Sequence, residues 1–315
     1  MNVEQFCSAS RVVIVAGKGG VGKTTVTAAL ATTAARAGAS VLIVEVEGKS
    51  GLAAALGTAP LTYEEQQVED RLRVRTVAPD EALLEYLEDR GLRRISKRMV
   101  RTGVLDVVAT AVPGMKDILV LGKVKQLEQA DVADLIIIDA PAAGHAITFL
   151  LSARGLLDAV RLGPVRSQAE DVIEMISDPT RCRVLLVTLP EETPVNELVE
   201  TAYALEDRVG VQLAPVIVNG VYPPLAGLDR DPQDVATQEG VTLAPGEADA
   251  LRAAARFRLQ RQELQTEQIG RLAEALPLPQ LHLPYLFADR IARPELESLA
   301  AALTAQIEGL AVAAT

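Results

Sequence analysis

Cysteine, histidine and aromatic residues are scarce in this chain of 315 residues, which has two cysteines, two histidines and no tryptophan. Cys7 and Cys182 lie too far apart in the sequence, and too far from the histidines, to form a metal-ligand motif. Lone thiols are typical of proteins in a reducing cytosol rather than of a disulfide framework. The composition therefore predicts a cytoplasmic chain without a disulfide framework or a cysteine–histidine metal site.

Two kinds of hydrophobic segment are also missing. The N-terminal sequence MNVEQFCSASR has no charged start followed by an apolar run, so we expect no signal peptide. An uninterrupted run of about 18 apolar residues occurs nowhere in the sequence, so we expect no membrane span.

Positive charge is in deficit, because the formal net charge is −11. Contact with nucleic acid or with an anionic membrane surface requires basic surface, so this charge argues against both partners. Hydrophobic residues make up 49% of the chain, which is ample for one large α/β domain or two smaller ones. Because the sequence does not divide into two similar halves and contains one phosphate-loop sequence, we expect a single domain over residues 1–315.

Short apolar runs alternate with helical stretches along most of the chain, a pattern typical of a mostly parallel sheet with helices on both faces. The runs are RVVIVA, SVLIVEVEG, RLRVRTV, ADLIIIDA, CRVLLVTLP and LAPVIVNG. Residues 80–130 are expected to form a helical subregion, and residues 223–248, rich in proline, glycine and acids, a long surface loop. A basic cluster at residues 90–101, spaced by three and four, predicts one helical face that is either solvated or bound to an acidic partner.

The stretch VAGKGGVGKTT, Val15–Thr25, carries the strongest functional signal. Its Gly17-x-x-x-x-Gly22-Lys23-Thr24 pattern follows a predicted strand and opens a predicted helix, which is the context a phosphate-binding loop requires. Glycines let backbone N–H groups turn toward phosphate oxygens, and the helix N-terminus adds favourable partial charge. Lys23 would bridge the β- and γ-phosphates, and the Thr24 hydroxyl would bind Mg²⁺. The expected nucleotide-binding residues of the loop are Gly17, Lys18, Gly19, Gly20, Val21, Gly22, Lys23, Thr24 and Thr25.

Lys18 is a second lysine in the same loop, five residues before Lys23. Two ammonium groups so close repel each other when no phosphate is bound, so Lys18 adds little to its own loop. It makes sense if it reaches a phosphate on a facing subunit, as an arginine finger does in trans. The alternative is an exposed lysine that the loop tolerates.

These residues carry a resemblance to a known class. GKGGVGKTT matches the deviant Walker A pattern, K-G-G-x-G-K-[ST], of the septum-placing, plasmid-partitioning, arsenite-pump and tail-anchored-protein-targeting ATPases. Within that class the chain most resembles the arsenite-pump and guided-entry (Get3-type) branch, and bacterial relatives encoded as two-chain pairs most of all. The resemblance is carried by AVPGMKDILVLGKVK, DAPAAGHAITFLL, VIVNG and LPLPQLHLP. It implies a P-loop NTPase fold of the SIMIBI type, ATP and Mg²⁺ as cofactors, and a dimer in which Lys18 contacts nucleotide across the interface.

The resemblance also implies roles for acidic residues at strand ends. Glu47 of VEVEG stands where the family has an aspartate that orders the attacking water. A carboxylate at this position is expected to face Mg²⁺ through the ion's coordination shell. Asp139 of LIIID matches the acid that holds a magnesium-bound water. The metal-binding residues that the resemblance implies are Thr24, Glu47 and Asp139. The catalytic residues that it implies are Lys18, Glu47 and Asp139. Without the resemblance, both acids could be strand-exit residues. Gly144 is expected to contact the γ-phosphate through its backbone N–H, although the family's Thr-Ala-Pro-Thr run is Ala-Pro-Ala-Ala in this chain.

The adenine is assigned to the last part of the sequence. The resemblance makes Asn219 the residue that hydrogen-bonds the base, while the Asn219-Gly220 pair by itself indicates a turn. Pro284 and Tyr285 either form a wall of the adenine site or pack at a strand end. LPEETPVNE, Leu189–Glu197, is predicted to start a helix capped by Thr193, with an interface as a second role.

Four activities of the class compete. Arsenite export needs paired and tripled cysteines and a second ATPase half, and the sequence has neither. Targeting of tail-anchored proteins needs a methionine-rich groove and a CxxC zinc clasp, and the sequence has neither of these. The C-terminal segment ESLAAALTAQIEGLAVAAT has no lysine or arginine for membrane positioning, and the net charge disfavours DNA partitioning. We therefore expect an ATP-driven dimerisation switch with an unassigned client, formed as a heterodimer with a related chain or as a homodimer. The alternative is a non-hydrolysing nucleotide-binding subunit that supports a catalytic sister chain.

Overall fold

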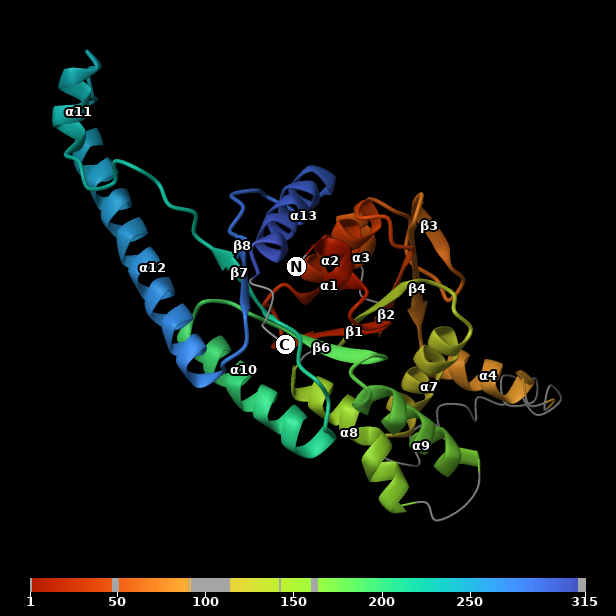
Figure 1. Ribbon diagram of the computed structural model, residues 1–315. Coiled ribbons are helices and arrows are strands. Elements are labelled where there is room, and N and C mark those ends of the chain that lie inside the picture. Colours follow the sequence, from red (N-terminus) through yellow and green to blue (C-terminus); the bar gives the residue numbers. More distant parts are fainter. Residues whose placement is uncertain are drawn as a thin grey trace.

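The computed structural model describes residues 2–46, 51–89, 91, 114–141, 143–159 and 164–310. Its centre is an eight-stranded sheet with the strand order β3-β4-β2-β5-β1-β6-β7-β8 (Figure 1). Every ladder is parallel except the one that joins β3 to β4. The strands are β1 (Val12–Gly17), β2 (Val41–Val46), β3 (Gln66–Glu69), β4 (Leu72–Val77), β5 (Leu135–Asp139), β6 (Cys182–Thr188), β7 (Val216–Val221) and β8 (Gln280–Pro284). The predicted α/β class with a mostly parallel sheet is confirmed.

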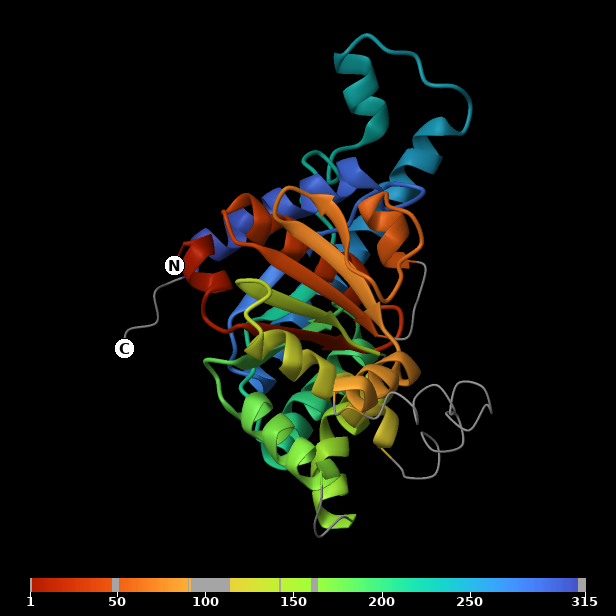
Figure 2. The ribbon, with the colours of Figure 1, turned by 90° about the vertical axis from the view of Figure 1, so that its right-hand side faces the viewer.

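Helices cover both faces of the sheet (Figures 1 and 2). One face carries α1 (Val3–Cys7), α2 (Lys23–Arg36), α3 (Gly51–Leu56) and α13 (Arg293–Glu308). The other carries α4 (Pro79–Asp89), α7 (Met115–Gln129), α8 (Ala143–Ala159), α9 (Pro164–Ser177), α10 (Glu192–Ala204) and the π-helical turn η1 (Leu205–Val209). Two helices, α11 (Pro232–Gln238) and α12 (Glu247–Ala275), extend away from the sheet.

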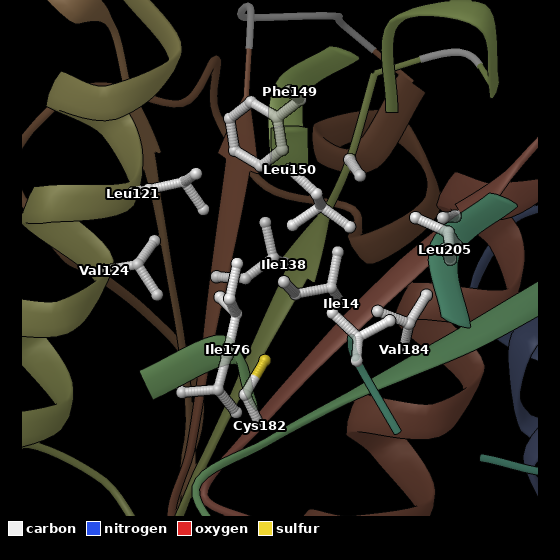
Figure 3. Packing of buried hydrophobic residues seen from close by; sticks show 14 of the residues in the cluster. Ile14, Leu121, Val124, Ile138, Phe149, Leu150, Ile176, Cys182, Val184 and Leu205 are labelled. Carbon is white, nitrogen blue, oxygen red and sulfur yellow. The ribbon is translucent and has the colours of Figure 1, made fainter. Parts of the chain in front are cut away.

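The apolar strand residues divide between two cores, one on each face of the sheet. In β1, Ile14 belongs to the core beneath α7, α8 and α9, whereas its neighbour Val15 belongs to the core beneath α2 and α13. Figure 3 shows Ile14 and Ile138 against side chains of the covering helices, among them Leu121 of α7 and Phe149 of α8. Because side chains alternate along a strand, a strand buried on both faces must be apolar throughout, which explains the continuous runs in the sequence.

Both cysteines are free and are buried in these cores. Burial raises the pKa of the Cys7 thiol to about 11 and that of the Cys182 thiol to about 12. Neither thiol ionises near neutral pH, and both pack as small apolar side chains.

Residues 223–248 are more ordered than the predicted surface loop, because α11 forms within them. The Asp231 side chain accepts a hydrogen bond from the Gln233 N–H at 2.9 Å, and Pro232 occupies the first helical position. This Asp-Pro start is a recognised helix signal that the proline-rich composition concealed. The segment leads into α12, a helix of 29 residues.

The start of α10 differs from the prediction. Its first residue is Glu192 and its N-cap is Glu191, so Thr193 lies inside the first turn instead of capping it. Pro194 is accepted there because the first N–H groups of a helix have no intrahelical acceptor. The basic cluster at residues 90–101 lies outside the described residues except for Gly91, and the separate helical subregion at 80–130 remains a prediction. In the part of the chain that the structure describes, no helix is long and apolar enough to cross a membrane.

Gly17, at the end of β1, is required by the close approach of β6. A Cβ atom at this position would lie 2.3 Å from the Val187 carbonyl oxygen, which is backbone and cannot rotate away. We expect Gly17→Ala to lower the free energy of unfolding by about 1–3 kcal/mol, the usual cost of overpacking. Denaturant unfolding would measure this loss.

Gly270 on α12 provides the matched control, since a Cβ there would meet nothing within 4 Å. Gly270→Ala should stabilise the protein slightly, by up to about 1 kcal/mol, because alanine is the better helix former. Equal stabilities for the Gly17→Ala variant and the wild type would contradict the steric argument.

Candidate nucleotide-binding site

The loop between β1 and α2 presents backbone N–H groups at the carboxyl edge of the sheet. Gly20 and Gly22 have φ angles of +86° and +90°, in the left-handed region that favours glycine. Gly22 is the N-cap of α2, and within the described chain no side chain caps that helix and no acidic residue lies in its first turn. A helix N-terminus of this kind favours an anion, through its first N–H groups and the helix dipole. The predicted loop residues therefore form a cradle whose chemistry fits phosphate.

Lys23, the first residue of α2, folds back over this loop. Its Nζ donates a hydrogen bond to the Lys18 carbonyl oxygen at 3.0 Å, and the residue is only 8% exposed. A buried ammonium held above a cradle of N–H groups adds a full positive charge to the site. Its position is set by the loop backbone and so exists before any ligand arrives.

Lys18 points in a different direction from Lys23. Its Nζ lies 2.5 Å from Glu197 Oε1 on α10, and its side chain is 39% exposed. This ion pair removes the repulsion that the sequence predicts between the two ammonium groups. The sequence predicts Glu197 in a helix start, and no motif in it indicates a contact with Lys18. The only available signal was the acidic character of LPEETPVNE.

Thr24 and Asp139, which the resemblance assigns to one metal site, meet directly. The Thr24 hydroxyl donates to Asp139 Oδ2 at 2.7 Å, and the Thr27 hydroxyl lies 3.5 Å from Asp139 Oδ1. Asp139 is buried at the end of β5, and the strand register places it beside Val15 of β1 and Glu45 of β2. A hydroxyl and a carboxylate are oxygen donors of the type that Mg²⁺ prefers.

Two further predicted site residues follow β2 and β5 in the sequence. Glu47 lies outside the described residues, and Gly144 lies in the first turn of α8, directly after β5. The described neighbour on β2 is Glu45, which is 2% exposed at the strand end beside Asp139. Within the described ranges no three acidic, histidine or cysteine side chains cluster as a metal site by themselves.

Asn219 contacts the phosphate loop from β7. Its Nδ2 donates to the Val21 carbonyl oxygen at 2.9 Å, and a Cβ on Gly22 would approach Nδ2 to 2.3 Å. The Asn219-Gly220 pair does not make a hairpin turn, since both residues lie within β7. Instead, the register with β8 shifts between Val218 and Val221, and Gly220 has a φ of +75°. This is a bulge, which turns side chains at a strand end toward a site.

Tyr285 lies in a small aromatic cluster next to this bulge. Pro284 ends β8, and the Tyr285 N–H donates to the Val221 carbonyl oxygen at 2.8 Å. The Tyr285 ring meets the Tyr222 ring edge-on at 5.1 Å and the Phe287 ring at 4.8 Å. The cluster is partly exposed, and Tyr222 and Phe287 are members that the sequence analysis missed. Binding of adenine by Tyr285 or by Asn219 remains a prediction.

An apolar cavity of about 400 Å³ lies between α4, α7 and α9. Leu83, Met115 and Leu119 contribute apolar lining, and Lys123 and Lys125 contribute polar edges. Both lysines are neutralised by ion pairs, Lys123 with Glu85 at 2.6 Å and Lys125 with Asp171 at 2.7 Å. Among the described residues, one methionine, Met115, lines the cavity.

Comparison with known proteins agrees with this geometry. The family model described as anion-transporting ATPase matches residues 10–162, which span the phosphate loop, Thr24 and Asp139. The ATPase BagA of Mycobacterium tuberculosis is 36% identical over 257 residues, covering 77% of this chain and 72% of that protein. A putative arsenical pump-driving ATPase of Halobacterium salinarum is 26% identical over 234 residues, which cover 68% of this chain and 36% of that protein. ATPase get3 of Schizosaccharomyces japonicus is 29% identical over 140 residues, which cover 44% of this chain and 42% of that protein.

Proposed function

The chain belongs to the anion-transporting ATPase family, and we propose that it is an ATP-binding and hydrolysing switch that closes a dimer on an unassigned client. The observation that carries the proposal is the arrangement of the loop: Lys23 folds over the cradle while Thr24 binds Asp139 at 2.7 Å. A second lysine of the same loop, Lys18, points away from it.

The residues present fit Mg·ATP. The loop N–H groups and Lys23 would hold the phosphates, Asn219, Pro284 and Tyr285 would surround the base, and Gly144 would contact the γ-phosphate. Thr24 and Asp139 would hold Mg²⁺, which when bound supplies charge neutralisation on the β- and γ-phosphates. The Thr24–Asp139 hydrogen bond keeps these two oxygen donors together at the end of β5. Asp139 acts through its charge and position, and it makes no bond to the reacting phosphate.

Glu47 is our candidate for ordering the attacking water. A carboxylate accepts a hydrogen bond from water and orients it for attack. A glutamate reaches about 1 Å further than the aspartate expected at this position, and such a shift can cost on the order of a hundredfold in rate. Slow hydrolysis, or hydrolysis that depends on a related partner chain, follows from this substitution. The second candidate function, a weakly hydrolysing nucleotide-binding subunit of a heteromeric complex, rests on the same glutamate.

The cysteines disfavour arsenite export by this chain. Metalloid binding requires several thiols close together, and the two free thiols are buried in separate cores, Cys182 in one and Cys7 in the other. Targeting of tail-anchored proteins is also less favoured, because the described apolar cavity contains a single methionine and its lysines are paired. The client therefore stays unassigned.

Single-turnover hydrolysis of ATP by the purified chain tests the proposal. The measurement would be made on the chain alone and after mixing with a related chain from the same source. Turnover by the chain alone supports the switch, and so does turnover in a mixture whose related chain has been inactivated in its own phosphate loop. Tight binding by this chain, with turnover only when the related chain's own site is intact, favours the nucleotide-binding subunit.

Lys18 is expected to act across a dimer interface. We expect Lys18→Ala to leave ATP affinity within about threefold of the wild type, because Lys18 points away from its own loop. Nucleotide-dependent assembly should weaken, and hydrolysis should fall on the order of a thousandfold, as on loss of a finger residue supplied in trans. Sedimentation velocity with a non-hydrolysable ATP analogue and a phosphate-release assay would measure the two effects.

Arg36 provides a control for the loss of one positive charge, since it lies in the last turn of α2, at the end of the helix away from the loop. Arg36→Ala should assemble and hydrolyse like the wild type. If Lys18→Ala also behaves like the wild type in both assays, the role in trans is wrong.

A further inference from the structure

We propose that Glu197 is the resting partner of Lys18 and sets the protein concentration at which nucleotide closes the dimer. This inference rests on the proposed function, because it concerns the same lysine. The ion pair links the phosphate loop to α10 across 179 positions of the sequence. Lys18 cannot give its charge fully to a phosphate on a facing subunit while the Glu197 carboxylate holds it.

The backbone that carries Glu197 is fixed. Val195 and Leu198, on either side of it, are buried in the core, and the Glu197 carbonyl oxygen accepts from the Thr201 hydroxyl at 2.6 Å. Helix α12 fastens the same end of α10, through Arg261 to Glu191 at 2.8 Å and Arg271 to Asn196 at 2.8 Å. Since α10 cannot follow the lysine, the pair must open for Lys18 to move.

The pair itself is open to solvent and so can exchange partners. The Lys18 and Glu197 side chains are 39% and 40% exposed, which screens their attraction. An ion pair of this kind is weak enough to be broken by a triphosphate, which offers more negative charge than one carboxylate. Two such pairs open when two copies of the chain meet. The small free energy needed to open one pair therefore enters the free energy of assembly twice.

The experiment compares Glu197→Gln with Glu200→Gln, which removes the same charge from the exposed side of α10. Assembly would be followed by sedimentation velocity against protein concentration, with magnesium and a non-hydrolysable ATP analogue. Glutamine keeps the size of the side chain but loses the charge, so Lys18 is released. We expect the half-assembly concentration of Glu197→Gln to fall about fivefold, with ATP affinity unchanged and Glu200→Gln like the wild type.

A double variant separates this role from a structural one. In the Lys18→Ala background, Glu197→Gln should have no further effect on assembly, because Glu197 acts through the lysine. Unchanged or weakened assembly by Glu197→Gln, or the same gain in the Lys18→Ala background, would overturn the inference while leaving the ATPase proposal intact. A wild-type chain that never assembles with nucleotide, alone or with a related chain, would overturn the proposed dimer switch and this inference with it.

Discussion

Replacement of Lys23 by alanine is expected to lower the affinity for ATP on the order of a hundredfold. The reason is that the variant loses a charge-assisted hydrogen bond, which contributes about 1.5–3 kcal/mol to binding. Lys23 is the only cation of the loop that the structure, in its described part, folds back onto the loop itself. Its ammonium is nearly buried above the N–H cradle, so no water or neighbouring cation replaces it when the side chain is removed. Isothermal titration calorimetry with Mg·ATP would measure the loss.

Two further variants serve as controls for the Lys23→Ala result. Alanine removes both the donor to the Lys18 carbonyl oxygen and the apolar stem of the side chain, whereas Lys23→Met removes the donor and keeps the stem, so the pair of variants separates lost packing from the lost charge. Lys18→Ala is the matched control, because it removes a lysine from the same loop and should bind ATP normally. If Lys23→Ala and Lys18→Ala bind ATP equally well, the assignment of phosphate binding to Lys23 fails.

The sheet and the phosphate loop were predictable because each depends on residues close together in the sequence. A buried parallel strand must be continuously apolar, so β1, β2, β5 and β6 are visible as runs of aliphatic residues. A loop with Gly17, Gly22 and Lys23 at fixed spacing between a strand and a helix has few other uses. The Thr24–Asp139 contact joins two residues that the resemblance assigns to one metal site.

The contacts that the sequence did not predict join distant segments through single side chains. Nothing in the spacing of Lys18 and Glu197 shows that α10 starts beside the phosphate loop; the strand order, with β6 next to β1, puts it there. The bulge that holds Asn219 against Val21 depends on the register between β7 and β8, and Asn-Gly by itself indicates a turn. Such contacts require the full topology, whereas apolar periodicity requires only a window of sequence.

The other large effect is expected at Glu47. Glu47→Gln should reduce single-turnover hydrolysis on the order of a hundredfold or more while ATP affinity stays near the wild-type value, because the amide cannot accept the proton or orient water as a carboxylate does. Glu47→Asp should instead raise turnover, by up to about a hundredfold, since it shortens the side chain to the length that the resemblance implies. Rapid-quench measurement of phosphate formation, with affinity measured separately, would distinguish a chemical effect from a binding effect.

Glu45 decides whether the Glu47 result is specific. It is the carboxylate of β2 that the structure places beside Asp139, and it is almost fully buried. If Glu45 supplied the water-ordering carboxylate, Glu45→Gln would abolish turnover and Glu47→Gln would not. With Glu47 in that role, Glu45→Gln should act mainly on stability and on Mg²⁺ affinity, because it changes the charge next to Asp139 and leaves the water in place. An unchanged rate for both Glu47 variants and for Glu45→Gln alike would contradict a water-ordering role for either carboxylate.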